Sequence, residues 1–174
     1  LPPQWYPTHS NAYYVGVTGG SFTEVSCMGM RSTAEHLQAE NNQFGNPFGT
    51  EIALFRTSEG GMARMAVSWD TPGVGGERGR IRTEKGTFYG EFQSGKKDAT
   101  SPAIARPPLP PGVEAGGHGG SHGYLMSEFI EAILLNRKPL VDVAQSLNMT
   151  VSGIVAHQSA LKDGELMNIP QYTL

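Results

Sequence analysis

The sequence is poor in charge and has no long apolar run. Only 17% of its 174 residues are charged, and 13 Lys and Arg against 16 Asp and Glu give a formal net charge of −3. This balance does not indicate the basic surface that binds nucleic acids or anionic membranes, so we expect neither as a partner. No apolar stretch approaches the roughly 18 residues of a membrane-spanning helix. Small neutral ligands suit this composition better.

The chain also lacks a second cysteine and a basic, then hydrophobic, leader at its amino end. Cys27 is the single cysteine, which excludes an internal disulfide, and its alternating neighbours indicate a half-buried thiol in a strand. Because the chain opens on Leu1 rather than Met, we expect it to be the carboxy-terminal part of a longer protein. We expect that protein to be soluble and cytoplasmic rather than exported; an export signal would lie before Leu1.

The sequence contains a run of strand patterns followed by a run of helix patterns. Residues 51–57 and 62–69 alternate in polarity around a glycine-bearing turn, which predicts an antiparallel hairpin. Further strands are expected at 22–28, 80–82, 87–89 and 166–169, with helices at 124–137 and 143–162 and a short helix that stops at glycines 19 and 20. This order predicts the α+β class: an open, mainly antiparallel β-sheet with helices packed on one face, in a single domain over residues 1–174.

The second face of this sheet is expected to be apolar. Met65, Val67 and Trp69 recur at every second position, and we assign them to that face. An extended apolar surface is rarely left in water. We therefore expect a homo-oligomer, a dimer or larger, formed through the open face of the sheet.

The first candidate site is the segment Tyr6, Pro7, Thr8 and His9. Pro7 fixes its own backbone and restricts Tyr6, so a phenol and an imidazole are presented from a stiffened loop. Such a pair is suited to donating and accepting a proton near neutral pH. The alternative interpretation is a helix-capping turn with an incidental histidine.

The second candidate site is the glycine-rich run 116–123, which contains His118 and His122. Its glycines permit close backbone approach to a ligand, and we expect both imidazoles to contact that ligand from a loop that leads into a helix at Tyr124. The alternative is a flexible hinge. Only Glu114 and Glu128 could complete a metal-ligand set, so we expect no metal.

Other signals are weaker. The glycine-rich run 73–79 is superficially like a dinucleotide-binding loop, but a strand is expected where that motif needs a helix, so this chain has no cofactor-binding fingerprint. Arg78, Arg80 and Arg82 share one strand face, which is more often a solvated face than an anion site. Of the three, we keep Arg78 as a candidate substrate-binding residue. We interpret His36 and His157 as structural.

Five short segments together resemble the carboxy-terminal domain of the Gfo/Idh/MocA oxidoreductases. They occur in order over nearly the whole chain: Tyr-Pro-Thr-His at 6–9, Gly-His-Gly-Gly at 117–120, Asn-Met-Thr at 148–150, His-Gln-Ser-Ala at 157–160 and Ile-Pro-Gln-Tyr at 169–172. The resemblance is to sugar or inositol dehydrogenase-like members and also to NAD-dependent α-N-acetylgalactosaminidases. It implies the open antiparallel sheet of this domain type, which is also dihydrodipicolinate reductase-like.

The resemblance implies that an amino-terminal Rossmann domain, absent from this chain, binds NAD or NADP and carries the family's Glu-Lys-Pro segment with its catalytic lysine. The present half would form the carbohydrate-binding cleft with that domain, pair with a second subunit and be inert alone. Tyr6 and His9 match a sugar-contacting segment in which the histidine transfers a proton. His118 matches a loop near the cleft.

The match departs from both branches of the family. Many dehydrogenases have an Asp and a His where this chain has Thr8 and Ala12, and the glycosidases have an acidic residue at His122 and an aromatic residue near Arg78. Three functions therefore stay open: the substrate-binding half of an NAD(P)-dependent oxidoreductase acting on a sugar or cyclitol, an NAD-dependent glycosidase that uses transient oxidation, and a stand-alone binding module. An in-frame Rossmann sequence directly before Leu1 would eliminate the third.

Overall fold

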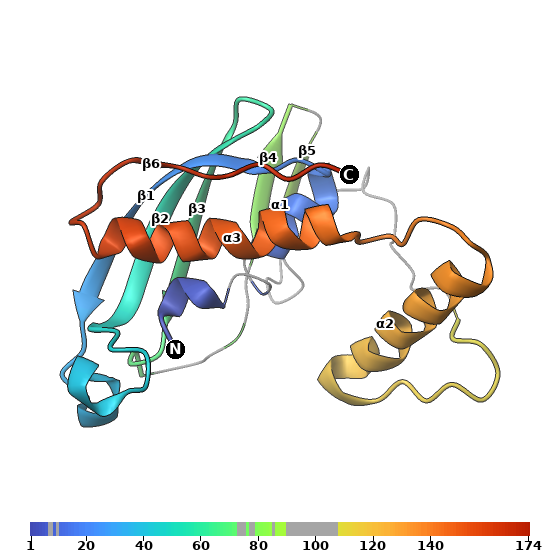
Figure 1. The fold of residues 1–174 in the computed structure, drawn as a ribbon, viewed down its shortest axis with the longest axis horizontal. Helices are drawn as coiled ribbons and strands as arrows, with labels where there is room; N and C mark the ends of the chain where they lie inside the picture. The colour runs from blue at the N-terminus through green and yellow to red at the C-terminus, as the bar shows by residue number, and fades with distance from the viewer. Residues whose placement is uncertain (7–8, 10, 73–75, 77–78, 85, 90–107) are drawn as a thin grey trace. The chain divides into compact units, whose positions relative to one another are not determined.

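A computed structural model describes residues 1–6, 9, 11–72, 76, 79–84, 86–89 and 108–174 (Figure 1). The chain divides into two compact units. The first comprises Leu1–Gly95 together with Val143–Leu174, and the second comprises Lys96–Asp142.

The first unit is built on a four-stranded antiparallel sheet in the order β3-β2-β1-β6. Its strands are β1 (Phe22–Arg31), β2 (Phe48–Thr57), β3 (Met62–Ser68) and β6 (Met167–Asn168). The predicted hairpin is confirmed: β2 and β3 are joined by a turn in which Gly60 has φ +81°, a conformation that favours glycine. The long helix α3 (Val143–Ala160) runs along one face of the sheet (Figure 1). The predicted open antiparallel sheet with helices on one face is therefore confirmed.

The core lies between the sheet and α3. Strand residues Val25, Cys27 and Phe55 are fully buried there against Val155 and Ala156 of the helix. The period of two along β2 places alternate side chains in this layer, and burying each large apolar side chain contributes about 1.5–3 kcal/mol. This layer fixes the sheet against α3 and thereby the frame on which the site is built.

A bulge near the start of β1 places Phe22 in the core. The simple alternation would place Phe22 on the side opposite Val25, yet both residues are completely buried. The β1–β2 register shifts between Phe22 and Glu24, and the extra residue turns Phe22 into the core, where its ring lies 4.6 Å from that of Phe55.

The open face of the sheet is apolar, but not through the residues expected. Met65 pairs with Ala53, so Met65 and Val67 belong to the helix-covered side. The opposite face instead presents partly exposed apolar side chains from three strands: Met28, Met30, Ile52, Leu54 and Met62. The prediction that Met65 and Val67 lie on the open face was therefore wrong, because both lie on the helix-covered face. The open face is nevertheless apolar.

Shorter elements complete the first unit. They are the 3₁₀ turns η1 (Pro3–Trp5), η3 (Glu35–Leu37) and η4 (Ala39–Asn41), the helix α1 (Asn11–Thr18), and a separate two-stranded sheet of β4 (Arg80–Thr83) and β5 (Gly86–Tyr89). Helix α1 ends at Thr18, directly before Gly19, which has φ +70°, as the glycine pair predicts. Its first residue, Asn11, donates a hydrogen bond to Ser152 Oγ of α3 at 2.7 Å.

The second unit contains helix α2 (Gly117–Leu134). The glycine-rich run was predicted to be a loop before a helix starting at Tyr124, but the helix already begins at Gly117, although His118 and Gly120 have positive φ. Beyond the helix, Arg137 forms ion pairs with Glu128 at 2.7 Å and Glu131 at 3.3 Å. No helix in the described ranges is long and apolar enough to cross a membrane.

Candidate functional site

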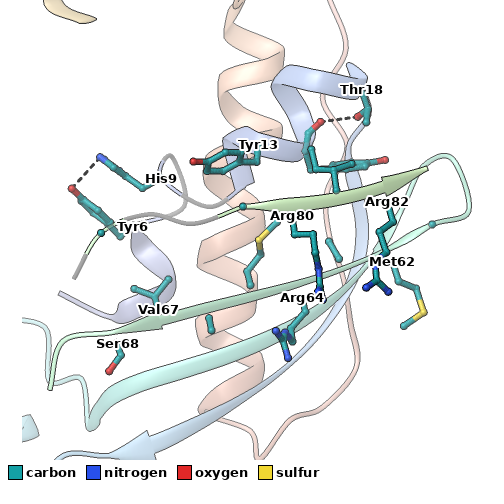
Figure 2. A pocket seen from close by; sticks show the side chains of 18 of the residues that line it. Tyr6, His9, Tyr13, Thr18, Met62, Arg64, Val67, Ser68, Arg80 and Arg82 are labelled. Atoms are coloured by element: carbon teal, nitrogen blue, oxygen red, sulfur yellow. Dashed lines mark hydrogen bonds between the residues drawn. The ribbon is translucent and has the colours of Figure 1, made fainter. Parts of the chain in front are cut away.

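A cavity of about 640 Å³ lies in the first unit, between β3, β4, α1 and the segment after η1 (Figure 2). Its lining combines hydroxyl, imidazole, aromatic and guanidinium groups. The residues that carry these groups are Tyr6, His9, Tyr13, Tyr14, Thr18, Arg64, Ser68, Trp69, Arg80, Arg82 and Thr83. A cavity of this size fits a small-molecule ligand.

Tyr6 and His9 lie in contact at one end of this cavity (Figure 2). The Tyr6 hydroxyl and His9 Nε2 are 3.2 Å apart, and the two rings stack with centroids 4.0 Å apart and planes 8° from parallel. The ring of Trp69 meets Tyr6 edge-on at 5.4 Å. The structure thus joins the two residues that the first motif singled out, while Pro7 and Thr8 lie outside the described residues.

Tyr6 is positioned by the short turn η1, which is anchored through Gln4. The backbone amide of Tyr6 donates to the carbonyl of Pro3 at 3.1 Å. One residue further in, the side chain of Gln4 donates to the backbone carbonyls of Glu51 and Met65, both at 3.2 Å. Because Gln4 is fully buried, these bonds fix the amino-terminal segment to the edge of the sheet.

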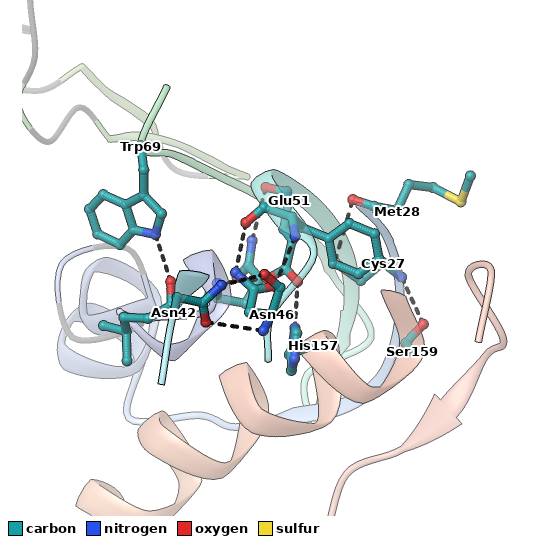
Figure 3. A network of polar contacts seen from close by, with 11 residues as sticks. Cys27, Met28, Asn42, Asn46, Glu51, Trp69, His157 and Ser159 are labelled. Atoms are coloured by element: carbon teal, nitrogen blue, oxygen red, sulfur yellow. Dashed lines mark hydrogen bonds and ion pairs between the residues drawn. The ribbon is translucent and has the colours of Figure 1, made fainter. Parts of the chain in front are cut away.

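Glu51 is the centre of the buried network that holds η1 (Figure 3). Its side chain is fully buried and accepts the Gln4 backbone amide at Oε2, at 2.8 Å. Its Oε1 lies 2.6 Å from Nδ1 of His157 on α3. A buried carboxylate is stable only when it is paired and hydrogen-bonded in this way. This cluster of Gln4, Glu51 and His157 is called the buried node below.

Sequence reasoning missed Glu51, although one signal for it was present. It has the same period along β2 as Ala53 and Phe55, which face the core. A charged residue at a core position needs a partner, and the histidine of the facing helix supplies it. His157, interpreted from the sequence as structural, is buried between Glu51, Trp5 and Phe48.

The three arginines of the cavity come from two strands. Arg64 belongs to β3, and Arg80 and Arg82 belong to β4, where a spacing of two places them on one face. Figure 2 shows Arg80 and Arg82 extending from β4 toward β3. The sequence pattern had favoured a solvated face for Arg80 and Arg82. Arg78, the third predicted member of that face, lies outside the described residues.

Helix α1 supplies two tyrosines that the motifs had not indicated. The backbone of Gly79 approaches the Tyr13 ring so closely that an added Cβ would lie 2.7 Å from it. A glycine is therefore required where β4 enters the cavity wall. The hydroxyl of Tyr14 is buried and has no hydrogen-bond partner within the part of the chain that the structure describes.

His118 and His122 lie in the second unit, on the first turns of α2. Both are exposed, and their ring centroids are 5.3 Å apart. No set of three or more His, Cys, Asp or Glu side chains that could hold a metal occurs in the described ranges. Each unit is described by itself, so these two imidazoles are assigned no place relative to Tyr6 and His9.

Two further features limit the chemistry of this chain. Burial raises the pKa of the Cys27 thiol to about 12, with the Glu51 charge adding to the effect, so the thiol is not a nucleophile at neutral pH. The glycine-rich run 73–79 is followed by the strand β4 rather than by a helix. A dinucleotide pyrophosphate binds at a helix amino terminus, and β4 does not supply the helix that this motif needs.

No family model matches the sequence, and no curated protein matches it. Several solved structures share its fold. An oxidoreductase domain protein from Kribbella flavida matches with a TM-score of 0.61 and 14% identity, over 93% of this chain and 50% of that one. Myo-inositol dehydrogenase from Lactobacillus casei, in complex with NAD(H) and myo-inositol, matches with a TM-score of 0.61 and 14% identity, over 100% of this chain and 50% of that one.

A third similar structure is the aldose-aldose oxidoreductase from Caulobacter crescentus complexed with glycerol, with a TM-score of 0.54 and 12% identity, over 95% of this chain and 46% of that one. The chain therefore spans about half the length of these proteins. These matches confirm the predicted fold, an open antiparallel sheet with helices packed on one face.

Proposed function

We propose that this chain is the substrate-binding half of an NAD(P)-dependent oxidoreductase that acts on a sugar or cyclitol. The observation that carries the proposal is the Tyr6–His9 pair, with its hydroxyl and Nε2 3.2 Å apart at a ligand-sized cavity. Its fold is shared with proteins whose structures contain myo-inositol or glycerol. A phenol and an imidazole in contact provide the proton acceptor that oxidation of a hydroxyl group requires.

The proposed reaction converts a secondary alcohol to a ketone. The carbon loses a hydride, which NAD(P) bound by a separate Rossmann domain accepts. The hydroxyl proton passes to His9, directly or through the Tyr6 hydroxyl, and the C–O bond becomes a carbonyl. Tyr6 keeps its position because η1 is held by the buried node. This chain alone is expected to be inert.

The other candidate residues have subsidiary roles in this proposal. Pro7 and Thr8 belong to the same substrate-contacting segment as Tyr6 and His9. Arg78 precedes Gly79, which packs on Tyr13 in the cavity wall. His118 and His122, on α2, are also assigned to substrate binding. The open apolar face joins two copies of the protein into a homo-oligomer.

The test uses the full-length protein that carries this chain. Reduction of NAD and NADP is followed by absorbance with a panel of sugars and cyclitols, and binding of each compound is measured by calorimetry in parallel. Saturable reduction with at least one compound, lost in His9→Ala, is the expected result. Binding of nucleotide without reduction across the panel would contradict the proposal.

An NAD-dependent glycosidase is the second candidate, and the direct Tyr6–His9 contact favours it, because that chemistry needs a proton donor and acceptor beside the sugar. It would remove a hydride beside an acidic carbon, eliminate the aglycone and return the hydride, without the paired carboxylates of most glycosidases. It predicts release of p-nitrophenol from an aryl glycoside with no net NADH. Net NADH formation without aglycone release favours the dehydrogenase.

A further inference from the structure

Three guanidinium groups line the same cavity as Tyr6 and His9. Arg64 projects from β3, and Arg80 and Arg82 project from β4 (Figure 2). No Asp or Glu is among the described residues of the lining. The cavity is therefore cationic within a chain whose formal net charge is −3, so the low overall charge, which favoured a neutral ligand, does not describe this site.

Two of these arginines have no partner in the described part of the chain: Arg64 and Arg82 form no hydrogen bond or ion pair there. Other arginines of the chain do: Arg56 pairs with Glu24 at 3.2 Å, and Arg137 pairs with Glu128 at 2.7 Å. Cations that line one cavity without carboxylates repel one another, and a cavity between low-dielectric walls strengthens the field that attracts an anion.

The chemistry and size of the cavity restrict what that anion is. The planar fork of arginine matches the oxygens of a carboxylate or a phosphate and binds them in bidentate fashion. The volume of about 640 Å³ suits one small molecule. A nucleic acid would require an extended basic surface, which the net charge of −3 does not provide.

The spacing along β3 also constrains the length of the ligand. Trp69 contacts Tyr6, and Arg64 lies five residues earlier, a separation of about 16 Å along an extended backbone. Because five is odd and Arg64 pairs with Leu54, the Arg64 and Trp69 side chains leave opposite faces of the edge strand β3. Even if the long Arg64 side chain extends toward Tyr6, the end of the cavity at Arg64 is separated from the Tyr6–His9 pair. A ligand that reaches both ends extends beyond a single sugar ring.

We infer that the substrate is an acidic saccharide, whose carboxylate or phosphate binds Arg64 and Arg82 while a hydroxyl of the reacting ring reaches Tyr6 and His9. This inference rests on the proposed function and specifies its substrate class. Arg80 lies between these two ends on the cavity wall (Figure 2) and adds to the positive field. The three arginines select for charge, and the Tyr6–His9 pair acts on the hydroxyl.

The test is calorimetric binding to the full-length protein in the presence of NAD, with charged and neutral probes in matched pairs. The pairs are glucuronate and glucose, glucose 6-phosphate and glucose, and cellobiouronate and cellobiose. At least one charged probe is expected to bind about tenfold or more tightly than its neutral partner. The pair with the largest ratio identifies carboxylate or phosphate as the anion, and a larger ratio for the disaccharide supports the two-ended ligand.

Arg64→Gln and Arg82→Gln are each expected to reduce this preference about tenfold, and raising the salt from 0.1 M to 1 M reduces it further, because the screening length falls from about 10 Å to about 3 Å. Arg31→Gln is the matched control: it is an exposed strand arginine outside the cavity, and its removal leaves the preference unchanged. Equal binding of charged and neutral probes, or a preference unaffected by both cavity variants, overturns the inference.

Failure of the proposed function gives a different result. If a neutral sugar reduces NAD while the arginine variants change nothing, the oxidoreductase stands and the acidic substrate is wrong. If charged probes bind through the arginines but no NADH forms with any of them, the anion site stands and the oxidoreductase is wrong.

Discussion

Two polar clusters lie in the first unit and differ in whether their charged groups have partners. In the buried node, the Glu51 side chain is fully buried and accepts hydrogen bonds from the Gln4 amide at 2.8 Å and from His157 at 2.6 Å. At the cavity, Arg64 and Arg82 are exposed and have no partner among the described residues. Polar groups that satisfy one another hold a structure together, whereas charged groups that line a cavity without partners are available to a ligand.

The two clusters are linked through a short piece of backbone. Gln4 belongs to the buried node, and Tyr6, two residues later, belongs to the cavity. The node therefore fixes the direction in which the phenol leaves η1. This link predicts that damage to the node lowers stability first and affects catalysis through the position of Tyr6.

The largest expected effect comes from removing the acceptor of the buried node. Glu51→Ala leaves His157 and the Gln4 amide without their acceptor, and breaking a buried pair in this way costs about 3–5 kcal/mol of the free energy of unfolding. Urea denaturation measures the loss. Glu24→Ala, which removes the partner of an exposed arginine, is the control and is expected to change it by less than about 1 kcal/mol. Equal losses of stability in the two variants would show that the buried node contributes no more to stability than an exposed ion pair.

A substitution at the cavity is expected to lower the rate of catalysis more than the free energy of unfolding. His9→Ala in the full-length protein lowers kcat about a hundredfold, because loss of a positioned acid–base group typically costs that much or more, while the free energy of unfolding changes little. Steady-state kinetics and urea denaturation of the same samples separate the two quantities. His36→Ala, on the turn η3, serves as the control. A variant that loses stability but keeps kcat would show that His9 belongs with the structural residues.

A smaller effect is expected on the open face of the sheet. Ile52→Glu places a charge among Met28, Leu54 and Met62, and a charge buried in an apolar interface weakens association. Light scattering of the full-length protein is expected to show a shift toward the monomer, while Gln158→Glu on α3 leaves the mass unchanged. A full-length protein that is already monomeric without substitution would exclude the proposed oligomer.

The smallest effect concerns pH and the second unit. The Arg137 guanidinium, helped by the Leu140 amide, lowers the pKa of Glu128 from 4.5 to about 2. The pair therefore contributes stability at pH values above the unfolded pKa, and this contribution is lost as the pH falls through the folded pKa. An NMR titration of the Glu128 carboxyl group checks the direction, and Arg137→Gln is expected to return the pKa toward its ordinary range. A titration unchanged by that substitution would contradict the assignment.

The local elements of the fold could be predicted because their causes are local. Alternation along β2 and β3, the turn at Gly60 and the glycines after α1 are visible in consecutive residues. The bulge that turns Phe22 inward and the register that places Met65 on the covered face are set by contacts with other strands. A pattern of period two identifies a strand but does not decide which of its faces is buried.

The residues of the candidate site also fall into two groups, those that are close in sequence and those that only the fold brings together. Tyr6 and His9 are three residues apart, so the sequence alone brought them together. Arg64 and Arg82 are brought to one cavity by β3 and β4, and Glu51 meets His157 across 106 positions of sequence. Neither local pattern indicates a distant partner. Arg80 and Arg82 were interpreted as a solvated face with no link to Arg64, and Glu51 was overlooked.

The most direct measurement is a crystal structure of the full-length protein with NAD and the saccharide that binds most tightly in calorimetry. Density for the saccharide is predicted in the cavity between β3 and β4, with one hydroxyl within hydrogen-bond distance of Tyr6 or His9. Saccharide density at another place on the protein, with this cavity filled by water alone, would contradict the account.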